Sequence, residues 1–346
     1  MVTHDIIVVG ASAGGVTALK DFVQSLPKDF MGSVFVVLHI PPYSESRLAW
    51  ILSNAGPLEA VQPQDGDRIK PGTIYVATND HHLLVEDNKI MVKKGPKENR
   101  FRPSIDALFR SAAYTFGSRV IGIVMSGLLN DGTSGLWAIK QREGIAIIQE
   151  PDDAEFAQMP ENVLEYVDVD YTVPAREMGS LLDKLMDEPA NEKHKISEKD
   201  LKRLHNEVTI AIHDNAFEMG IMDMGELTPF TCPECHGALV KLVEGKLLRY
   251  RCHTGHAYTA STLLASVTES VEGLLWQGMR GMEETTMLLN NIADHFEEMG
   301  KSDSADIFRK KAKATSKRAR TIHDSVFTQE QYSEDIRFKR EDKSDK

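Results

Sequence analysis

Cysteine is scarce in this sequence, and long hydrophobic runs are absent from it. Its 346 residues include 3 cysteines, all between Cys232 and Cys252. An odd number of cysteines in one short segment argues against a disulfide framework and favours a metal site in a reducing compartment. No apolar run approaches the ~20 residues that span a bilayer, and the first residues lack the basic and apolar regions of a signal peptide. These absences argue against a disulfide-stapled secreted protein and against direct membrane insertion, and they predict a cytoplasmic protein.

An excess of basic charge is missing as well. The chain carries 40 Lys and Arg residues against 52 Asp and Glu residues, a net charge of -12 at pH 7. Acidic residues spread along the sequence would repel nucleic-acid phosphates, so no nucleic-acid partner is expected. One basic stretch, between Arg309 and Arg320, is the exception. A solvated helix face explains this stretch more simply than a docking site for an acidic partner.

Apolar, β-branched runs alternate with amphipathic stretches from residue 5 to about residue 185. Strands are expected at residues 6–9, 34–39, 73–77, 120–125 and 145–149, and helices after Gly15, Ser44, Pro103, Gly132 and Pro160. This alternation predicts an α/β domain over residues 3–187, with a doubly wound, mostly parallel sheet and helices on both faces, in three layers. Residues 74–92 instead show the pattern of antiparallel hairpins, which predicts an insertion at a sheet edge.

The remaining sequence predicts four further segments. Residues 188–227 are polar with a weak helical pattern, and they are expected to form a linker or a peripheral helix. Cysteines and histidines then define a small module over residues 228–260. Residues 261–328 repeat apolar side chains near a 3.5-residue spacing, with a stop at Gly300, which predicts a helical hairpin. The charged residues 329–346 are expected to be a disordered tail.

A serine lies in the glycine-rich turn that follows the first expected strand. The segment Gly10-Ala11-Ser12-Ala13-Gly14 is close to the dinucleotide fingerprint, but Ser12 occupies the position of the glycine that lets pyrophosphate approach the backbone. The same residues fit Gly-x-Ser-x-Gly, the strand-to-helix elbow of a nucleophilic serine, although in α/β-hydrolases that elbow follows several strands. A small residue filling a tight turn is the third interpretation. The segment alone leaves all three open.

Two residues at other strand ends favour the nucleophile. His39 ends one expected strand and Asp131 lies in the loop after another, and in open α/β sheets the functional crevice lies beyond such ends. An imidazole can take the serine proton while a carboxylate holds the ring in the correct tautomer. The candidate triad is therefore Ser12, His39 and Asp131. The backbone N–H of Ala13 is the first candidate oxyanion donor, and the glycine-rich loop at Gly127-Leu128 could offer the second.

Three other residues compete for the roles of base and acid. His81 and His82 are rival bases, but they fall in the turn of the expected hairpin and are predicted to be exposed or at the rim of the site. Asp106 is a rival acid. It falls at the start of an expected helix, where the macrodipole favours an acidic residue, and this is the simpler explanation. None of the three displaces the candidate triad.

Taken together, five motifs resemble the catalytic domain of the chemotaxis protein-glutamate methylesterases. They are Gly-Ala-Ser-Ala-Gly-Gly at 10–15, Leu38-His39, Arg-Pro-Ser-Ile-Asp at 102–106, Ser-Gly-Leu-Leu-Asn-Asp-Gly at 126–132 and Met159-Pro160. The resemblance covers about residues 3–185 in order. It implies hydrolysis of glutamate γ-methyl esters, and often deamidation of glutamines, on cytoplasmic helices of chemoreceptors, with no cofactor for catalysis.

The same resemblance assigns roles and a partner. It places the triad on Ser12, His39 and Asp131, and the oxyanion N–H groups on Ala13 and Leu128. A methylated chemoreceptor or a related signalling protein is the implied partner. Leu128 replaces a methionine that is usual in the family, but its role is that of a backbone donor, so activity is expected to survive.

A second departure from the family pattern concerns regulation. Family members usually begin with a phosphoacceptor receiver domain, whereas the first catalytic strand is expected here at about Asp5, which leaves no room for one. Control by aspartyl phosphorylation in cis is therefore not expected. Two alternatives to an esterase stay open. One is a non-catalytic signalling scaffold or sensor that acts through the C-terminal modules, and the other is a nucleotide-binding enzyme, which Ser12 disfavours.

The Cys/His segment predicts a structural zinc site. Cys232 and Cys235 are followed by Cys252 and His256, a Cys₃His set with knuckle-like spacing. Four such ligands leave no open coordination position, so the metal would hold the fold and take no part in catalysis. The other interpretation is three buried thiols beside surface histidines. Some standalone relatives of the methylesterases carry similar zinc-ribbon and helical extensions, and this weaker resemblance makes residues 228–260 a zinc-ribbon-like module.

Overall fold

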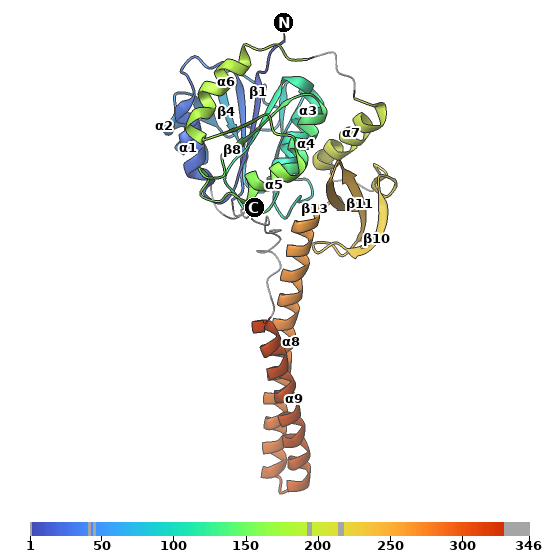
Figure 1. The fold of residues 1–346 in the computed structure, drawn as a ribbon. Coiled ribbons are helices and arrows are strands. Elements are labelled where there is room, and N and C mark those ends of the chain that lie inside the picture. Colours follow the sequence, from blue (N-terminus) through green and yellow to red (C-terminus); the bar gives the residue numbers. More distant parts are fainter. Residues whose placement is uncertain (1, 41–42, 44–45, 192–195, 214–217, 329–346) are drawn as a thin grey trace, which may run out of the picture. The chain divides into compact units, whose positions relative to one another are not determined.

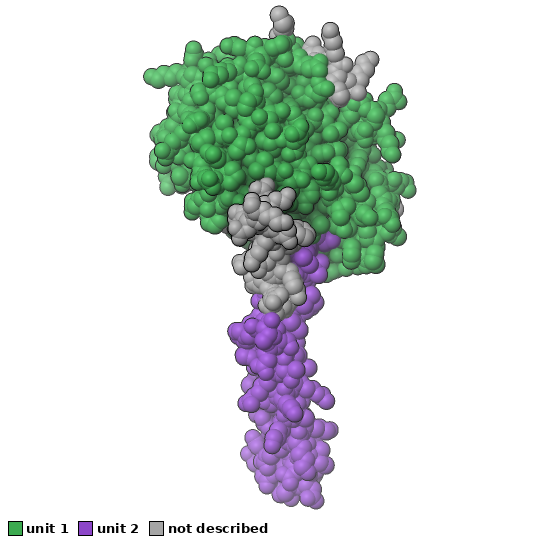
Figure 2. Space-filling model, in the orientation of Figure 1, with its two compact units in different colours: residues 1–262 green, residues 263–346 purple. Residues whose placement is uncertain are grey.

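The computed structural model describes residues 2–40, 43, 46–191, 196–213 and 218–328. Two compact units make up the chain, residues 1–262 and residues 263–346, which Figure 2 shows in different colours. The Cys/His module expected over residues 228–260 therefore belongs to the first unit. The tail expected over residues 329–346 lies outside the described residues, and the finer division at residues 187 and 260 stays a prediction.

A sheet of seven parallel strands forms the centre of the first unit (Figure 1). Its order is β3-β4-β2-β1-β7-β8-β9, and each neighbouring pair is parallel. The strands are β1 (Ile6–Ala11), β2 (Ser33–Leu38), β3 (Glu59–Val61), β4 (Thr73–Val76), β7 (Val120–Val124), β8 (Ile145–Gln149) and β9 (Tyr171–Val173). The predicted doubly wound parallel sheet is confirmed. The edge strands β3 and β9 were not predicted, because a strand of 3 residues is too short to show a pattern.

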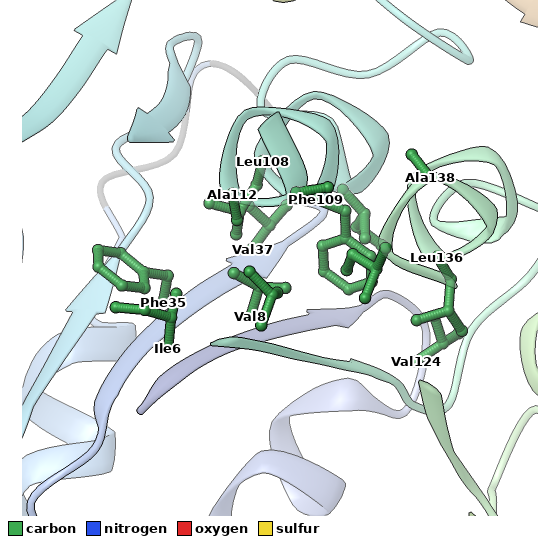
Figure 3. Close-up of a cluster of buried hydrophobic side chains, with 14 of the residues drawn as sticks. Ile6, Val8, Phe35, Val37, Leu108, Phe109, Ala112, Val124, Leu136 and Ala138 are labelled. Atoms are coloured by element: carbon green, nitrogen blue, oxygen red, sulfur yellow. The ribbon is translucent and has the colours of Figure 1, made fainter. Parts of the chain in front are cut away.

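Helices cover both faces of this sheet. One face carries α1 (Gly15–Ser25), α2 (Leu48–Ala55) and α6 (Met178–Met186), and the other carries α3 (Ile105–Phe116), α4 (Thr133–Gln141) and α5 (Gln158–Tyr166). Side chains alternate between the faces, so Val8 packs under α3 (Figure 3) while Val9 packs under α1. Strands buried on both faces need apolar residues at every position, which is the sequence pattern of β1 and β2.

The strand order reverses between β1 and β7. Strands β2, β3 and β4 lie on one side of β1, in the spatial order β2, β4, β3, and the later strands β7, β8 and β9 lie on the other side. Open α/β sheets bind their ligands in the crevice at such a switch point, beyond the carboxyl ends of the strands. The residues that follow β1, β2 and β7 therefore share one location.

An antiparallel hairpin lies beside α3, outside the main sheet. It consists of β5 (His82–Glu86) and β6 (Lys89–Lys93), joined by Asp87 and Asn88 with φ values of 46° and 64°. Two consecutive residues in the left-handed region are typical of the tight turns that match the twist of a hairpin. The hairpin predicted within residues 74–92 is thus present, but the expected place at a sheet edge was wrong, because β5 and β6 form a sheet of their own. The first strand of that region, β4, joins the parallel sheet.

The polar segment after the α/β domain contains a packed helix. This helix, α7 (Glu198–His213), buries Leu204 in the core on the α3 side of the sheet and packs Ala211 against Leu84 and Ala107. A sheet of four antiparallel strands follows, made of β10 (Glu226–Thr231), β11 (Ala238–Glu244), β12 (Leu247–Cys252) and β13 (Ala257–Thr259). It carries the Cys/His module.

Two long helices form the predicted helical hairpin. They are α8 (Ala260–Glu298) and α9 (Ser302–Thr328), and Gly300, with a φ of 69°, lies in the connection. Phe296 stacks on Phe308 with ring centroids 5.4 Å apart, and Arg309 in the basic stretch pairs with Asp294 and Glu297 of α8. In the described part of the chain, no helix is long and apolar enough to cross a membrane.

Candidate active site

Ser12 follows β1 directly, in a turn shaped by glycine. Its N–H donates to the Ser126 carbonyl at 2.9 Å, and its own carbonyl accepts from the Gly15 N–H at 2.9 Å. Gly14 adopts a φ of 70°, and a Cβ at that position would lie 2.6 Å from Ser126 Oγ. Only glycine tolerates both conditions. The turn therefore holds the Ser12 hydroxyl at the carboxyl end of the sheet, next to the N-terminus of α1.

Ser12, His39 and Asp131 form one continuous chain of hydrogen bonds. His39 Nδ1 lies 3.2 Å from Ser12 Oγ, and His39 Nε2 lies 2.8 Å from Asp131 Oδ2. The side chains of His39 and Asp131 are 3% and 1% exposed. Three residues that come from the ends of β1, β2 and β7 thus meet at the switch point. The ring nitrogens are used in the opposite sense to the serine proteases, where Nε2 faces the serine.

The Asp131 carboxylate accepts from five donors. They are His39 Nε2, Asn99 Nδ2, Ser104 Oγ and the backbone N–H groups of Ile105 and Asp106. Burial would raise the pKa of Asp131, but the hydrogen bonds from His39, Asn99 and Ile105 outweigh it and hold this pKa well below its usual range. The ionised carboxylate keeps a proton on His39 Nε2, which leaves Nδ1 to accept the proton of Ser12.

A second buried carboxyl, Asp106, faces Asp131 across Asn99. Asn99 Nδ2 donates to Asp106 Oδ2 at 2.8 Å and to Asp131 Oδ1 at 2.9 Å. The other oxygen of Asp106 accepts the N–H groups of Gly132 and Gly135 at the start of α4, at 3.0 and 2.6 Å. Asp106 was expected to favour the N-terminus of its own helix. It lies in the first turn of α3, as expected, and in addition it caps the neighbouring helix α4.

The pH dependence of stability reports on Asp106. Burial first, and then the charge of Asp131, raises its pKa from 3.8 to about 8. The folded chain therefore keeps a proton that the unfolded chain loses, and this stabilisation fades as the pH rises from about 4 to about 8, by up to ~1.4 kcal/mol per pH unit. In Asp106→Asn, we expect the free energy of unfolding to fall less steeply across this range. Denaturant titrations at several pH values give this free energy for both proteins. If it changed with pH equally in both, the assignment would be contradicted.

The loop after β7 lies against Ser12. A Cβ added to Gly127 would come 2.9 Å from the Ser12 Cβ. Three acceptors hold the loop, since Ser126 donates its N–H to Gln149 Oε1, Gly127 to the Phe156 carbonyl and Leu129 to Gln158 Oε1. The N–H groups of Ala13 and Leu128 meet no protein acceptor within the described residues. Ala13 follows Ser12 directly and Leu128 follows the glycine that lies against Ser12, and their role as oxyanion donors stays a prediction.

The rival bases are engaged elsewhere. His82 is fully buried, because β5 packs against α3, and the expectation of an exposed or rim position was wrong for it. Its Nε2 lies 2.9 Å from the Pro96 carbonyl, and its Nδ1 accepts the Ser104 N–H at 3.2 Å. Burial lowers the pKa of His82. His81 Nδ1 bonds the carbonyl of Asn79 at 2.9 Å. Neither ring completes a chain to Ser12.

Two residues of the site escaped the sequence interpretation. Asn99 contacts both buried carboxyls, as described above, and the ring of Phe101 stacks on His39 at 3.6 Å between centroids and 7° between planes. Both belong to a turn in which Asn99 and Arg100 have φ values of 49° and 77°. Asn is the residue that enters this region most readily after glycine, and that preference is the one local signal they carry.

A separate cluster lies in the four-stranded sheet β10–β13, which we call the ribbon sheet, and could hold a metal ion. Its members are Cys232, Cys235, Cys252 and His256, whose ligand atoms all lie within 4.8 Å of one another. The Cys235 and Cys252 sulfurs are 3.6 Å apart, and His256 Nδ1 lies 3.7 and 3.6 Å from the sulfurs of Cys232 and Cys252. Tetrahedral zinc with its usual bonds to sulfur and nitrogen separates its ligand atoms by roughly 3.5–3.8 Å. The four predicted ligands therefore fit zinc in number, type and spacing.

Comparison with known proteins finds relatives of the α/β part of the chain. A Thermotoga maritima protein-glutamate methylesterase/protein-glutamine glutaminase is 32% identical over 189 residues, which are 54% of this chain and 55% of that protein. A Leptospira interrogans protein provisionally described by the same name is 34% identical over 183 residues, 53% of this chain and 95% of that protein. The crystal structure of the Thermotoga maritima CheB methylesterase catalytic domain superposes with a TM-score of 0.51 and 32% identity, covering 53% of this chain and 100% of that one.

The family comparison agrees with these relatives. The model of the CheB methylesterase family matches residues 7–182. This range begins at the second residue of β1 and extends into α6, so it contains the rest of the parallel sheet and the three residues of the hydrogen-bonded chain. The chain belongs to the CheB methylesterase family.

Proposed function

We propose that this protein is a protein-glutamate methylesterase that can also deamidate glutamines, with Ser12 as nucleophile, His39 as general base and Asp131 as the acid that orients the ring. The observation that carries the proposal is the continuous hydrogen-bond chain among these residues at the switch point of the sheet. Family membership supports the choice of reaction. The substrate is a methylated glutamate side chain on a chemoreceptor or a related signalling protein.

The reaction follows from the geometry in two steps. Ser12 Oγ attacks the γ-carbonyl carbon of the methylated glutamate while its proton passes to His39 Nδ1. The N–H groups of Ala13 and Leu128 stabilise the oxyanion that forms. His39 returns the proton to the departing methoxide, so methanol leaves and a glutamyl ester remains on Ser12. Water, deprotonated by His39, then cleaves this ester and restores the free glutamate and Ser12. A glutamine would release ammonia by the same steps, and no cofactor takes part.

Three exposed apolar side chains belong to segments that adjoin Ser12. Val16, Leu128 and Phe156 are 40%, 46% and 36% exposed. Val16 lies in the first turn of α1, Leu128 follows the glycine that touches Ser12, and the Phe156 carbonyl holds that same glycine. Apolar groups at the mouth of a site can pack against one face of an amphipathic helix. This rim supports a helical protein segment as substrate, such as the cytoplasmic helix of a chemoreceptor.

Release of methanol tests the proposed function. The full chain is incubated with a chemoreceptor cytoplasmic fragment that carries labelled methyl esters on its glutamates, and labelled methanol and free carboxylates are expected. Mass spectrometry of the fragment follows conversion of glutamine to glutamate in the same reaction. Hydrolysis of a small activated ester without methanol release would mean a different ester substrate. If neither the methylated fragment nor the small activated ester were hydrolysed, the assignment of an esterase would be contradicted and the non-catalytic scaffold favoured.

A structural zinc in the Cys₃His cluster is the second part of the proposal. The donor set of three thiols and one imidazole supports a closed, four-coordinate site that stabilises the ribbon sheet. Cysteine thiolates that bind a structural zinc are typical of a reducing compartment, which supports a cytoplasmic location.

Metal analysis of two matched variants tests the zinc. The purified chain is expected to hold about one equivalent of zinc, and His256→Gln to hold less than about half an equivalent and to unfold at a lower temperature. His253→Gln makes the same change at a neighbouring histidine outside the cluster, and it should keep both the metal and the stability. Equal zinc content in the two variants, or none in the unaltered chain, would refute the site.

A further inference from the structure

Residues 98–101 form a tight turn beside the triad. The N–H of Glu98 donates to the Phe101 carbonyl at 3.1 Å, and the N–H of Phe101 donates back to the Glu98 carbonyl at 2.9 Å. The two residues between them, Asn99 and Arg100, are both left-handed, as a two-residue turn of this kind requires. We refer to residues 98–101 as the active-site turn.

The active-site turn touches two members of the triad. Asn99 Nδ2 donates to Asp131 Oδ1, and the Phe101 ring lies flat on the ring of His39. Asn99 and Asp131 are both almost fully buried, at 2% and 1% exposure. Because the contact atoms are enclosed, a displacement of the turn would move the acid, the base or both.

Side chains and backbone that follow the Cys/His cluster hold this turn from the other side. The oxygen of the Asn99 amide accepts the Thr259 N–H at 3.0 Å and the Thr262 hydroxyl at 3.1 Å. The Thr259 hydroxyl donates to Asn130 Oδ1 at 2.6 Å, next to Asp131 in the chain. Thr259 and Thr262 are fully buried. The oxygen of the Asn99 amide is thus bonded to Thr259 and Thr262, and its NH₂ group is bonded to Asp131 and Asp106.

The backbone and a buried ion cluster reinforce the same connection. The Asn99 N–H donates to the Ala257 carbonyl at 2.8 Å, so the turn extends the edge of β13. Glu98 pairs with Arg110 of α3 and, at 2.8 Å, with Arg251 of β12. Burial would raise the pKa of Glu98, but these two arginines outweigh it and lower this pKa to about 2. A buried charge pair tolerates little displacement, because a separated partner would be left unpaired.

We propose that Asn99 is a positioning residue for Asp131, and that residues 257–262 hold the active-site turn so that the triad is ordered only when this part of the ribbon is in place. The inference rests on the proposed reactivity of Ser12. It makes the C-terminal sheet a support of the active site, in addition to any role in binding partners. Loss of the Thr262 hydroxyl that donates to the Asn99 amide oxygen would let the amide rotate and would weaken its bond to Asp131. The attack of Ser12, which His39 assists as general base, would then be slower.

Three variants of threonine test the proposal in the full chain. Thr262→Val keeps the shape of the side chain and removes the hydroxyl that donates to the Asn99 amide oxygen and accepts the Thr259 N–H at 2.8 Å. Thr262→Ser keeps that hydroxyl. Thr228→Val is the matched control, because the Thr228 hydroxyl donates to the Leu239 carbonyl inside the ribbon sheet, at 2.8 Å. The measurements are kcat and KM for methanol release, and the rate at which a fluorophosphonate labels the protein, each with a melting curve.

Thr262→Val is expected to lower kcat and the labelling rate together by about 5- to 30-fold, with KM changed by less than about twofold. Thr262→Ser and Thr228→Val should stay within about twofold of the unaltered chain. Equal rates for Thr262→Val and Thr228→Val would overturn the proposal. If Thr262→Val does not fold, Thr259→Val decides by the same criteria, because it removes the hydroxyl that donates to Asn130.

The two readouts separate this proposal from the proposed function. Labelling without methanol release would contradict the methylesterase assignment while the threonine series still decides the positioning role through its labelling rates. An unaltered chain that resists the fluorophosphonate would contradict both, since no activated serine would then exist to be positioned.

Discussion

Asp131→Asn is expected to lower kcat for ester hydrolysis by about 10³–10⁴-fold. An amide cannot hold the proton on His39 Nε2, so the ring would present the wrong tautomer to Ser12. The fold should suffer as well. All five partners of Asp131 donate to it, so an amide NH₂ in either orientation would face donors and leave them unsatisfied. We expect the free energy of unfolding to fall by about 1–3 kcal/mol.

Asp170→Asn is the matched control for this change. Asp170 also accepts a backbone N–H, that of Ala146 at 2.7 Å, and pairs with Lys140, but its side chain is partly exposed and takes no part in the triad. It should retain full activity. Steady-state kinetics and denaturant unfolding on both variants check the prediction. Asp131→Asn with activity within tenfold of the unaltered chain would mean that Asp131 does not orient the base.

Ser12→Ala is expected to reduce methanol release by about 10⁴–10⁶-fold, because no other atom of the site can form the acyl-enzyme. Stability should change little. The Ser12 hydroxyl makes one hydrogen bond in the described part of the chain, at 3.2 Å to His39. Rate assays with labelled substrate, at enzyme concentrations high enough to detect the residual rate, give the magnitude.

Ser180→Ala provides the control for this second change. Its hydroxyl donates to the Glu177 carbonyl on the exposed side of α6, and its removal should leave the rate unaltered. A Ser12→Ala protein that keeps more than about a tenth of the activity would show that the ester is cleaved by direct attack of water. In that case His39 and Asp131 would act on a water molecule, and the covalent mechanism would be wrong.

Local patterns predicted the parts of the fold that carry the triad. The buried runs of β1, β2 and β7 have the apolar residues that a doubly covered parallel strand needs, and each ends in a polar residue or a glycine-rich loop. Because the carboxyl ends of parallel strands meet at one edge, the proximity of Ser12, His39 and Asp131 could be predicted before any distance was known. The structure then brings these three residues into contact.

Contacts that depend on packing between distant elements could not be predicted in this way. Asp106 reads as the acid of its own helix, and only the placement of α4 beside α3 lets it cap Gly132 and Gly135. His82 reads as a turn residue, but the hairpin folds against α3 and buries it. Asn99 shows no period or motif, since its partners come from loops and strands far away in the chain.

The identity of the serine that reacts with a fluorophosphonate tests the central claim most directly. The full chain is treated with the probe, and intact mass followed by peptide mapping counts and locates the adducts. We predict one adduct per chain, on Ser12, and none on Ser12→Ala under the same conditions. An unlabelled chain, or an adduct on another residue in the unaltered protein, would contradict the assignment of Ser12 as the nucleophile.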